Sequence, residues 1–92
     1  MYRYGWHPQG DDQAPSARIE QTASFDDAFD GLRQAIADAA SDAVEYVDDG
    51  RRARRLTRAW SAFGTYLDAL ADLGDNVQAT GPDGVVYWIA KA

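Results

Sequence analysis

Two stripes of apolar residues with helical spacing occupy the middle of the chain and restrict the folds that it can adopt. In each stripe the apolar residues recur at alternating intervals of four and three, which places them on one face of an α-helix. The first stripe consists of Phe25, Phe29, Leu32, Ile36, Ala39, Ala43 and Tyr46. The second consists of Leu56, Trp60, Phe63, Leu67 and Leu70. These patterns predict two amphipathic helices, at about residues 25–48 and 52–73.

Both predicted helices have boundary signals. Ser24 precedes the first stripe and is followed three residues later by Asp27, which is the pattern of a helix N-cap. Gly50 and Gly74 follow the two stripes, and we expect them to end the helices, because glycine adopts the left-handed conformation at low cost. The short connection predicts an antiparallel helical hairpin. One helix bent at Gly50 is the alternative, since a single glycine carries only a modest penalty.

The clearest strand signal lies at the C-terminus. Residues 77–80 and 85–90 are rich in β-formers, and they flank the turn sequence Gly81-Pro82-Asp83-Gly84. The second of these strands carries apolar residues on both faces. We therefore expect it either to lie inside a sheet that is covered on both sides, or to present one face to a partner.

The N-terminal part of the chain predicts at most two short strands. Alternation in residues 2–6 places Tyr2, Tyr4 and Trp6 on one face of a strand, and residues 17–22 form a weaker strand candidate. We expect residues 1–16 to be flexible or to contain an edge strand. The fold class is therefore α+β, in a single domain of residues 1–92. It is a helical hairpin packed on a small antiparallel sheet, made of the C-terminal β-hairpin and one or two N-terminal strands.

A dense cluster of arginines interrupts an acidic chain. The chain has 15 Asp and Glu against nine Lys and Arg, a net charge of −6. Five arginines nevertheless fall within eight residues: Arg51, Arg52, Arg54, Arg55 and Arg58. If the second stripe faces the core, all but Arg52 point outward at the tip of the hairpin. Guanidinium groups in this arrangement suit carboxylates or phosphates.

The arginines have two interpretations, and the sequence leaves both open. Acids at intervals of four, three and four lie on one flank of the first helix, where they can face the second helix and pair with the arginines. These acids are Asp38, Asp42, Glu45 and Asp49. Alternatively, the arginines bind an acidic protein partner. Direct binding of nucleic acid is disfavoured by the net negative charge, whereas an acidic helix face that mimics nucleic acid is a further possibility.

No residue pattern indicates catalysis, a cofactor or a metal site. The chain has no cysteine, and its one histidine, His7, lies beside Pro8 in a predicted loop. His7 with Asp11 and Asp12 lacks the fixed spacing of a metal site. No apolar run approaches the roughly 20 residues of a membrane span, and no signal-peptide pattern is present. We therefore expect a non-enzymatic cytoplasmic protein without cofactor or metal.

The expected function is protein binding. Surplus tyrosine and tryptophan either pack over the C-terminal hairpin or form a contact surface, because these residues and arginine dominate interface energies. The expected partner-binding residues are Arg51, Arg54, Arg55, Arg58, Tyr2, Tyr4, Trp6 and Trp88. Small size and a composition typical of high-GC genomes favour a phage or mobile-element factor that inhibits a host or defence protein. The alternatives are a self-associating assembly subunit, such as a homodimer, and the nucleic-acid mimic.

Overall fold

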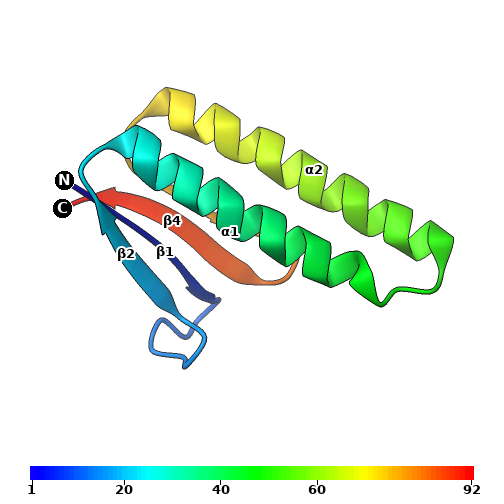
Figure 1. The fold of residues 1–92 in the computed structure, drawn as a ribbon. Coiled ribbons are helices and arrows are strands. Elements are labelled where there is room, and N and C mark those ends of the chain that lie inside the picture. Colours follow the sequence, from blue (N-terminus) through cyan, green and yellow to red (C-terminus); the bar gives the residue numbers. More distant parts are fainter.

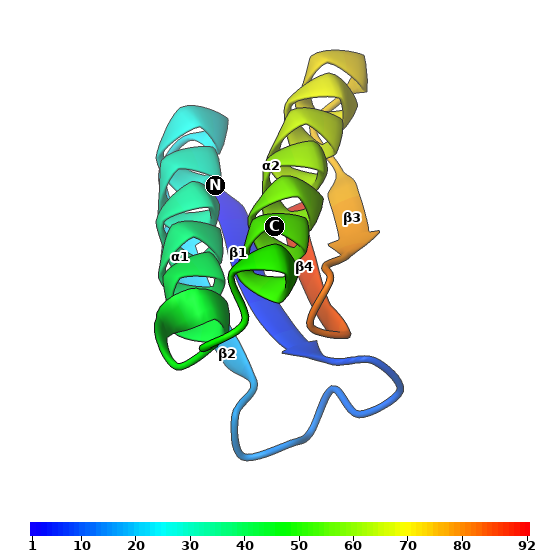
Figure 2. The same cartoon turned by 90° about the vertical axis from the view of Figure 1, so that its right-hand side faces the viewer.

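Two antiparallel helices lie on one face of a four-stranded antiparallel sheet in the computed structural model, which describes residues 1–92 (Figures 1 and 2). In chain order the elements are β1 (Tyr2–Pro8), β2 (Arg18–Thr22), α1 (Phe25–Glu45), α2 (Gly50–Leu73), β3 (Val77–Thr80) and β4 (Val85–Lys91). The strand order is β2-β1-β4-β3. This arrangement confirms the α+β class, the helical hairpin and the C-terminal β-hairpin, and it excludes a single bent helix.

The first and last strands form the centre of the sheet. β1 pairs with β4 along its whole length, from Tyr2 opposite Lys91 to Pro8 opposite Val85. β2 pairs with the other side of β1, so the N-terminal strand lies inside the sheet and not at its edge, where we had expected it. Periodicity predicts a strand but carries no information on which neighbours will satisfy its backbone groups.

The N-terminus of α1 is capped as the sequence predicts. The backbone N–H of Asp27 donates to the Ser24 hydroxyl oxygen over 3.1 Å. The other end of this helix differs from the prediction, because α1 ends at Glu45. Tyr46 was predicted to continue the apolar stripe, but it is 85% exposed, since it follows the last helical residue.

The prediction that Gly50 ends the first helix is wrong. Gly50 is instead the first residue of α2, and Asp49 is its N-cap. The Asp49 carboxylate accepts the backbone N–H groups of Arg51 and Arg52, over 2.9 Å and 3.4 Å. A carboxylate in this position accepts free backbone N–H groups and is attracted to the positive end of the helix dipole. The side chain of Asp49 therefore stabilises the start of α2 at Gly50.

The core lies between the two helices and the sheet. Both stripes contribute to it, and the strands supply alternate residues. Its buried members are Ala28, Leu32, Ile36, Trp60, Phe63, Leu67, Val77, Ala79, Tyr87 and Ile89. The two phenylalanines of the first stripe, Phe25 and Phe29, stack on one another at the border of this core, with ring centroids 6.0 Å apart.

The C-terminal hairpin has the turn that its sequence predicts. Gly84 adopts a positive φ of 76°, and its N–H donates to the Gly81 carbonyl over 3.0 Å. The Tyr87 hydroxyl donates to the Asp83 carboxylate over 3.0 Å, which joins the turn to the core. Burial raises the pKa of Tyr87 above its usual range, and the negative charge of Asp83 adds to this shift.

The tip of the helical hairpin projects beyond the sheet (Figure 1). Helices of 21 and 24 residues are about 31 and 36 Å long, whereas strands of at most seven residues span about 23 Å. The overhanging part contains the arginine cluster. Neither helix has the length of apolar sequence needed to cross a membrane.

Candidate functional site

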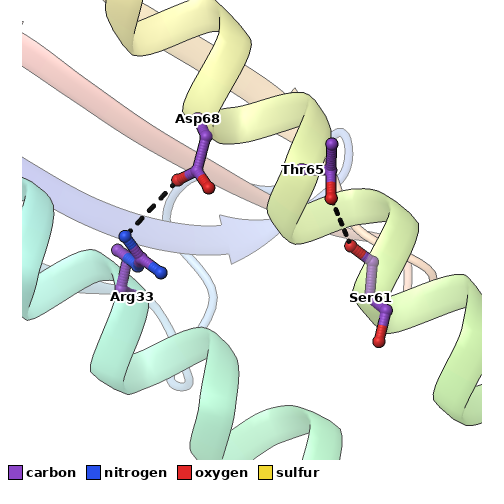
Figure 3. A network of polar contacts seen from close by, with 4 residues as sticks. All are labelled: Arg33, Ser61, Thr65 and Asp68. Atoms are coloured by element: carbon purple, nitrogen blue, oxygen red, sulfur yellow. Dashed lines mark hydrogen bonds and ion pairs between the residues drawn. The ribbon is translucent and has the colours of Figure 1, made fainter.

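The five arginines between residues 51 and 58, which we call the arginine tip, occupy the first turns of α2, and all are exposed. None of them forms an ion pair. The one ion pair of the structure joins Arg33 on α1 to Asp68 on α2, with 3.5 Å between Nη1 and Oδ1 (Figure 3). The predicted neutralisation of the arginines by carboxylates of the first helix is therefore not present.

Two of the acids that were predicted to face the second helix, Asp38 and Asp42, lie on another side of α1, and Asp49 lies outside α1 as the N-cap of α2. Asp38 and Asp42 border a hollow together with Trp6 and His7 of β1. The flank of α1 that faces α2 consists mostly of small and apolar residues, namely Ile36, Ala37, Ala40, Ser41 and Val44, with Arg33 at one end. The 4-3-4 spacing shows that acids share a face, but it does not show which neighbour that face meets.

A groove runs between α1 and α2 on the surface that faces away from the sheet. Its volume is about 430 Å³, and its floor contains the buried side chains of Ile36, Trp60 and Leu67. Its walls are low, because they consist mostly of alanine, serine, threonine and glycine. We did not predict this groove. Its signal in the sequence is the run of small residues at helical spacing beside each apolar stripe.

The three N-terminal aromatics face the helices. Tyr2 meets Phe25 edge-on, with ring centroids 5.8 Å apart, and Tyr4 lies against Gly31 of α1. Together with Trp6 they are half-buried and pack against the core. Packing was one of the two predicted roles, and a partner contact for these residues stays a prediction.

Trp88 lies on the opposite face of the sheet. It pairs with Gly5, and a side chain at Gly5 would meet the Trp88 ring at 3.0 Å. A hollow of about 460 Å³ surrounds the ring, bordered by Gln78 and by Ile19, which is 66% exposed. The eight predicted partner-binding residues thus form three separate groups: the tip, the helix-facing side of β1, and the open face of the sheet.

No group of three or more histidine, aspartate or glutamate side chains is placed to hold a metal ion. Comparison of the chain with protein-family models, with curated proteins and with solved structures finds no match.

Proposed function

We propose that this protein is a small, non-enzymatic binding domain whose arginine tip contacts an acidic surface of another protein. The observation that carries the proposal is that five exposed arginines, held beyond the sheet, have no carboxylate partner within the fold. Guanidinium groups form paired, charge-assisted hydrogen bonds with carboxylates, which gives such a contact both energy and orientation.

The charge of the rest of the molecule supports a specific orientation of binding. Outside the tip the chain carries 15 acids and only four other bases, so the tip is the basic pole of an acidic protein. Such polarity steers an acidic partner to one end and repels it from the other surfaces. It also opposes a long polyanion, which would contact the acidic flanks as well as the tip.

The proposal is tested by affinity capture from the nuclease-treated lysate of a high-GC bacterium. We compare the wild type with the fourfold variant Arg51→Ala, Arg54→Ala, Arg55→Ala, Arg58→Ala. A control variant removes three bases elsewhere: Arg3→Ala, Arg18→Ala and Lys91→Ala. We expect the wild type and the control to retain the same protein, in a salt-sensitive manner, and the fourfold variant to lose it. Equal retention by all three proteins, or loss of retention after nuclease treatment, would overturn the proposal.

We further propose that the domain acts in the cytoplasm, and that it is a phage or mobile-element factor that inhibits a host or defence protein. Both parts of this proposal rest on the size, the composition and the lack of cysteine. Inhibition predicts that expression in a high-GC host impairs one host process, and that the fourfold arginine variant does not. If instead substitution of Asp38 and Asp42 by asparagine abolishes capture, the acidic flank is the binding surface, as a nucleic-acid mimic requires.

A second candidate function is self-association through the open face of the sheet. This face carries Trp88 and the exposed Ile19, and none of its strand residues is acidic, whereas Asp12 of the loop after β1 borders the hollow around Trp88. An apolar centre with charged residues at its rim is typical of interfaces. Sedimentation equilibrium should then show a dimer for the wild type and a monomer for Ile19→Lys. A monomeric wild type at millimolar concentration would exclude this function.

A further inference from the structure

One glycine inside a helix, Gly64, is not required by any close contact within the fold. Gly31 of α1 is required, because a side chain there would collide with Tyr4. Gly64, in the middle of α2, has no atom of another element within 4 Å of the position that a Cβ would occupy. Glycine inside a helix is less stable than alanine. Open space above Gly64 therefore points to an approach from outside the molecule.

Gly64 lines the groove between α1 and α2. Ser61 on the same helix and Ala40 on the other line the groove as well, so a second backbone can come close to both helices. The ion pair between Arg33 and Asp68 bridges the two helices at one end of the groove (Figure 3). The other end runs toward the arginine tip.

None of the tip arginines lines the groove, but helical phase places two of them nearest to its α2 margin. Successive helical residues are rotated by about 100°, so Arg54 and Arg58 lie within about 60° of the groove residue Ser61. Arg52 and Arg55 lie about 120° or more away from it on the same scale. The groove thus has a basic margin on its α2 side.

We propose that the groove receives an α-helix of the acidic partner, with small or apolar residues against Gly64 and acidic residues against Arg54 and Arg58. This inference rests on the proposed function of the arginine tip and names the element that the tip recognises. A furrow between two parallel ridges accepts the ridge of a third helix. The groove residues of α2 run from Thr57 to Leu67, about 15 Å, which matches roughly three helical turns.

The hydrogen bonds around the groove favour a helix over an extended peptide. The groove lining offers three hydroxyl groups, those of Ser41, Thr57 and Ser61, and that of Thr57 already donates to the Ala53 carbonyl over 2.9 Å. The groove therefore offers few partners for the N–H and C=O groups of an extended chain. A helix satisfies these groups internally.

The probe for this inference is a fluorescent, stapled 18-residue helix with alanine and leucine on one face and glutamate along one flank. Binding is measured by anisotropy, and the contact surface is mapped by amide shifts of the ¹⁵N-labelled full chain. We expect Gly64→Met, which fills the groove, to weaken binding at least tenfold. The matched control, Ala62→Met, places the same side chain about 160° away on α2 and should bind as the wild type does.

The arginine pairs separate this inference from the proposed function. Arg54→Ala with Arg58→Ala should weaken binding more than Arg52→Ala with Arg55→Ala, although both double variants remove two charges. If the two pairs weaken binding equally and Gly64→Met has no effect, the groove is not the binding site and the arginine tip alone is the binding surface. No weakening by either pair would overturn the arginine function itself.

Three further outcomes would each overturn the groove inference. The first is no binding of the stapled helix at millimolar concentration. The second is equal binding of a version with proline at its centre, which would show that an extended chain is accepted. The third is a concentration-dependent shift of the Gly64 amide without any peptide, which would show that a second copy of the chain occupies the groove.

Discussion

The ring of Tyr4 lies so close to the backbone of Gly31 that a methyl group at Gly31 would overlap the tyrosine hydroxyl and the adjacent ring carbons. This contact joins the central strand β1 to helix α1. Because glycine lacks a Cβ, the helix can approach the sheet closely enough for the tyrosine ring to fit beneath it. Gly31 is thus a requirement of packing, in spite of its low helix propensity.

Gly31→Ala should therefore destabilise the fold. Alanine gains about 0.5–1 kcal/mol of helix propensity, but moving a rigid ring in a packed layer costs about 1–3 kcal/mol. We expect a net loss of about 1–2 kcal/mol in the free energy of unfolding, measured by urea denaturation. Gly64→Ala is the matched control, and it should increase stability by about 0.5–1 kcal/mol, since its Cβ enters open space.

The role of Tyr4 is checked in a second background. When Tyr4 is replaced by alanine, Gly31→Ala should become neutral or stabilising, because the colliding ring is absent. If Gly31→Ala costs the same in both backgrounds, the contact does not explain the glycine.

Periodicity and capping predicted most of this fold. The stripes around Leu32 and Leu67, the cap at Ser24 and the left-handed Gly84 are local features, and each is present as expected. The errors at Tyr46 and Gly50 are local, whereas the others concern relationships between distant segments. The interior position of β1 depends on pairing with β4, roughly 80 residues later in the chain, for which the sequence has no local signal.

Tyr87 should make the protein sensitive to alkali. Burial and the charge of Asp83 raise its pKa in the folded state, whereas the unfolded chain releases this proton near pH 10. Above pH 10 the unfolded state therefore binds fewer protons than the native state, and stability falls as pH rises, by up to about 1.4 kcal/mol per pH unit. Below pH 10 the hydroxyl is neutral in both states and contributes no pH dependence.

Urea denaturation of Tyr87→Phe between pH 8 and pH 11 checks this prediction. The variant loses the hydrogen bond to Asp83, so we expect about 1 kcal/mol lower stability at pH 8. It should also show a shallower decline above pH 10. Tyr66→Phe serves as the control, since this residue is 55% exposed, and it should follow the wild-type profile. An unchanged alkaline decline in Tyr87→Phe would contradict the assignment.

Asp49 should be important for the hairpin turn. It accepts two backbone N–H groups at the start of α2, so Asp49→Ala should cost about 1–2 kcal/mol of unfolding free energy. Asp49→Asn keeps the acceptor oxygen but removes the charge, and it should lose less. The difference between the two variants should shrink at high salt if it is electrostatic. A neutral Asp49→Ala would show that the turn does not depend on this cap.

The candidate site was less predictable than the fold. The exposed arginines were evident from the sequence, but their freedom from ion pairs was not, because it depends on which way Asp38 and Asp42 point around α1. The groove was harder to find, since small residues beside an apolar stripe also occur on ordinary solvent-exposed flanks. Gly64 becomes informative only when the space above its backbone is known to be empty.

The arginine tip should reduce the stability of the free protein. Arg51 and Arg52 lie in the first turn of α2, where the helix dipole repels positive charge, and neither has an ion-pair partner. Arg51→Ala and Arg52→Ala should each increase the free energy of unfolding by about 0.3–1 kcal/mol at low salt. This gain should nearly vanish at 1 M salt, where the screening length is about 3 Å.

Arg33→Ala is the control for this prediction. Arg33 has a partner in Asp68, so its removal should be neutral or should cost up to about 1 kcal/mol, the opposite sign to the tip variants. If Arg51→Ala lowers stability as Arg33→Ala does, the tip arginines form ion pairs with acidic side chains of the same protein in solution, and their role is structural. If it raises stability, the chain retains residues that weaken its fold, which is the behaviour of residues kept for binding.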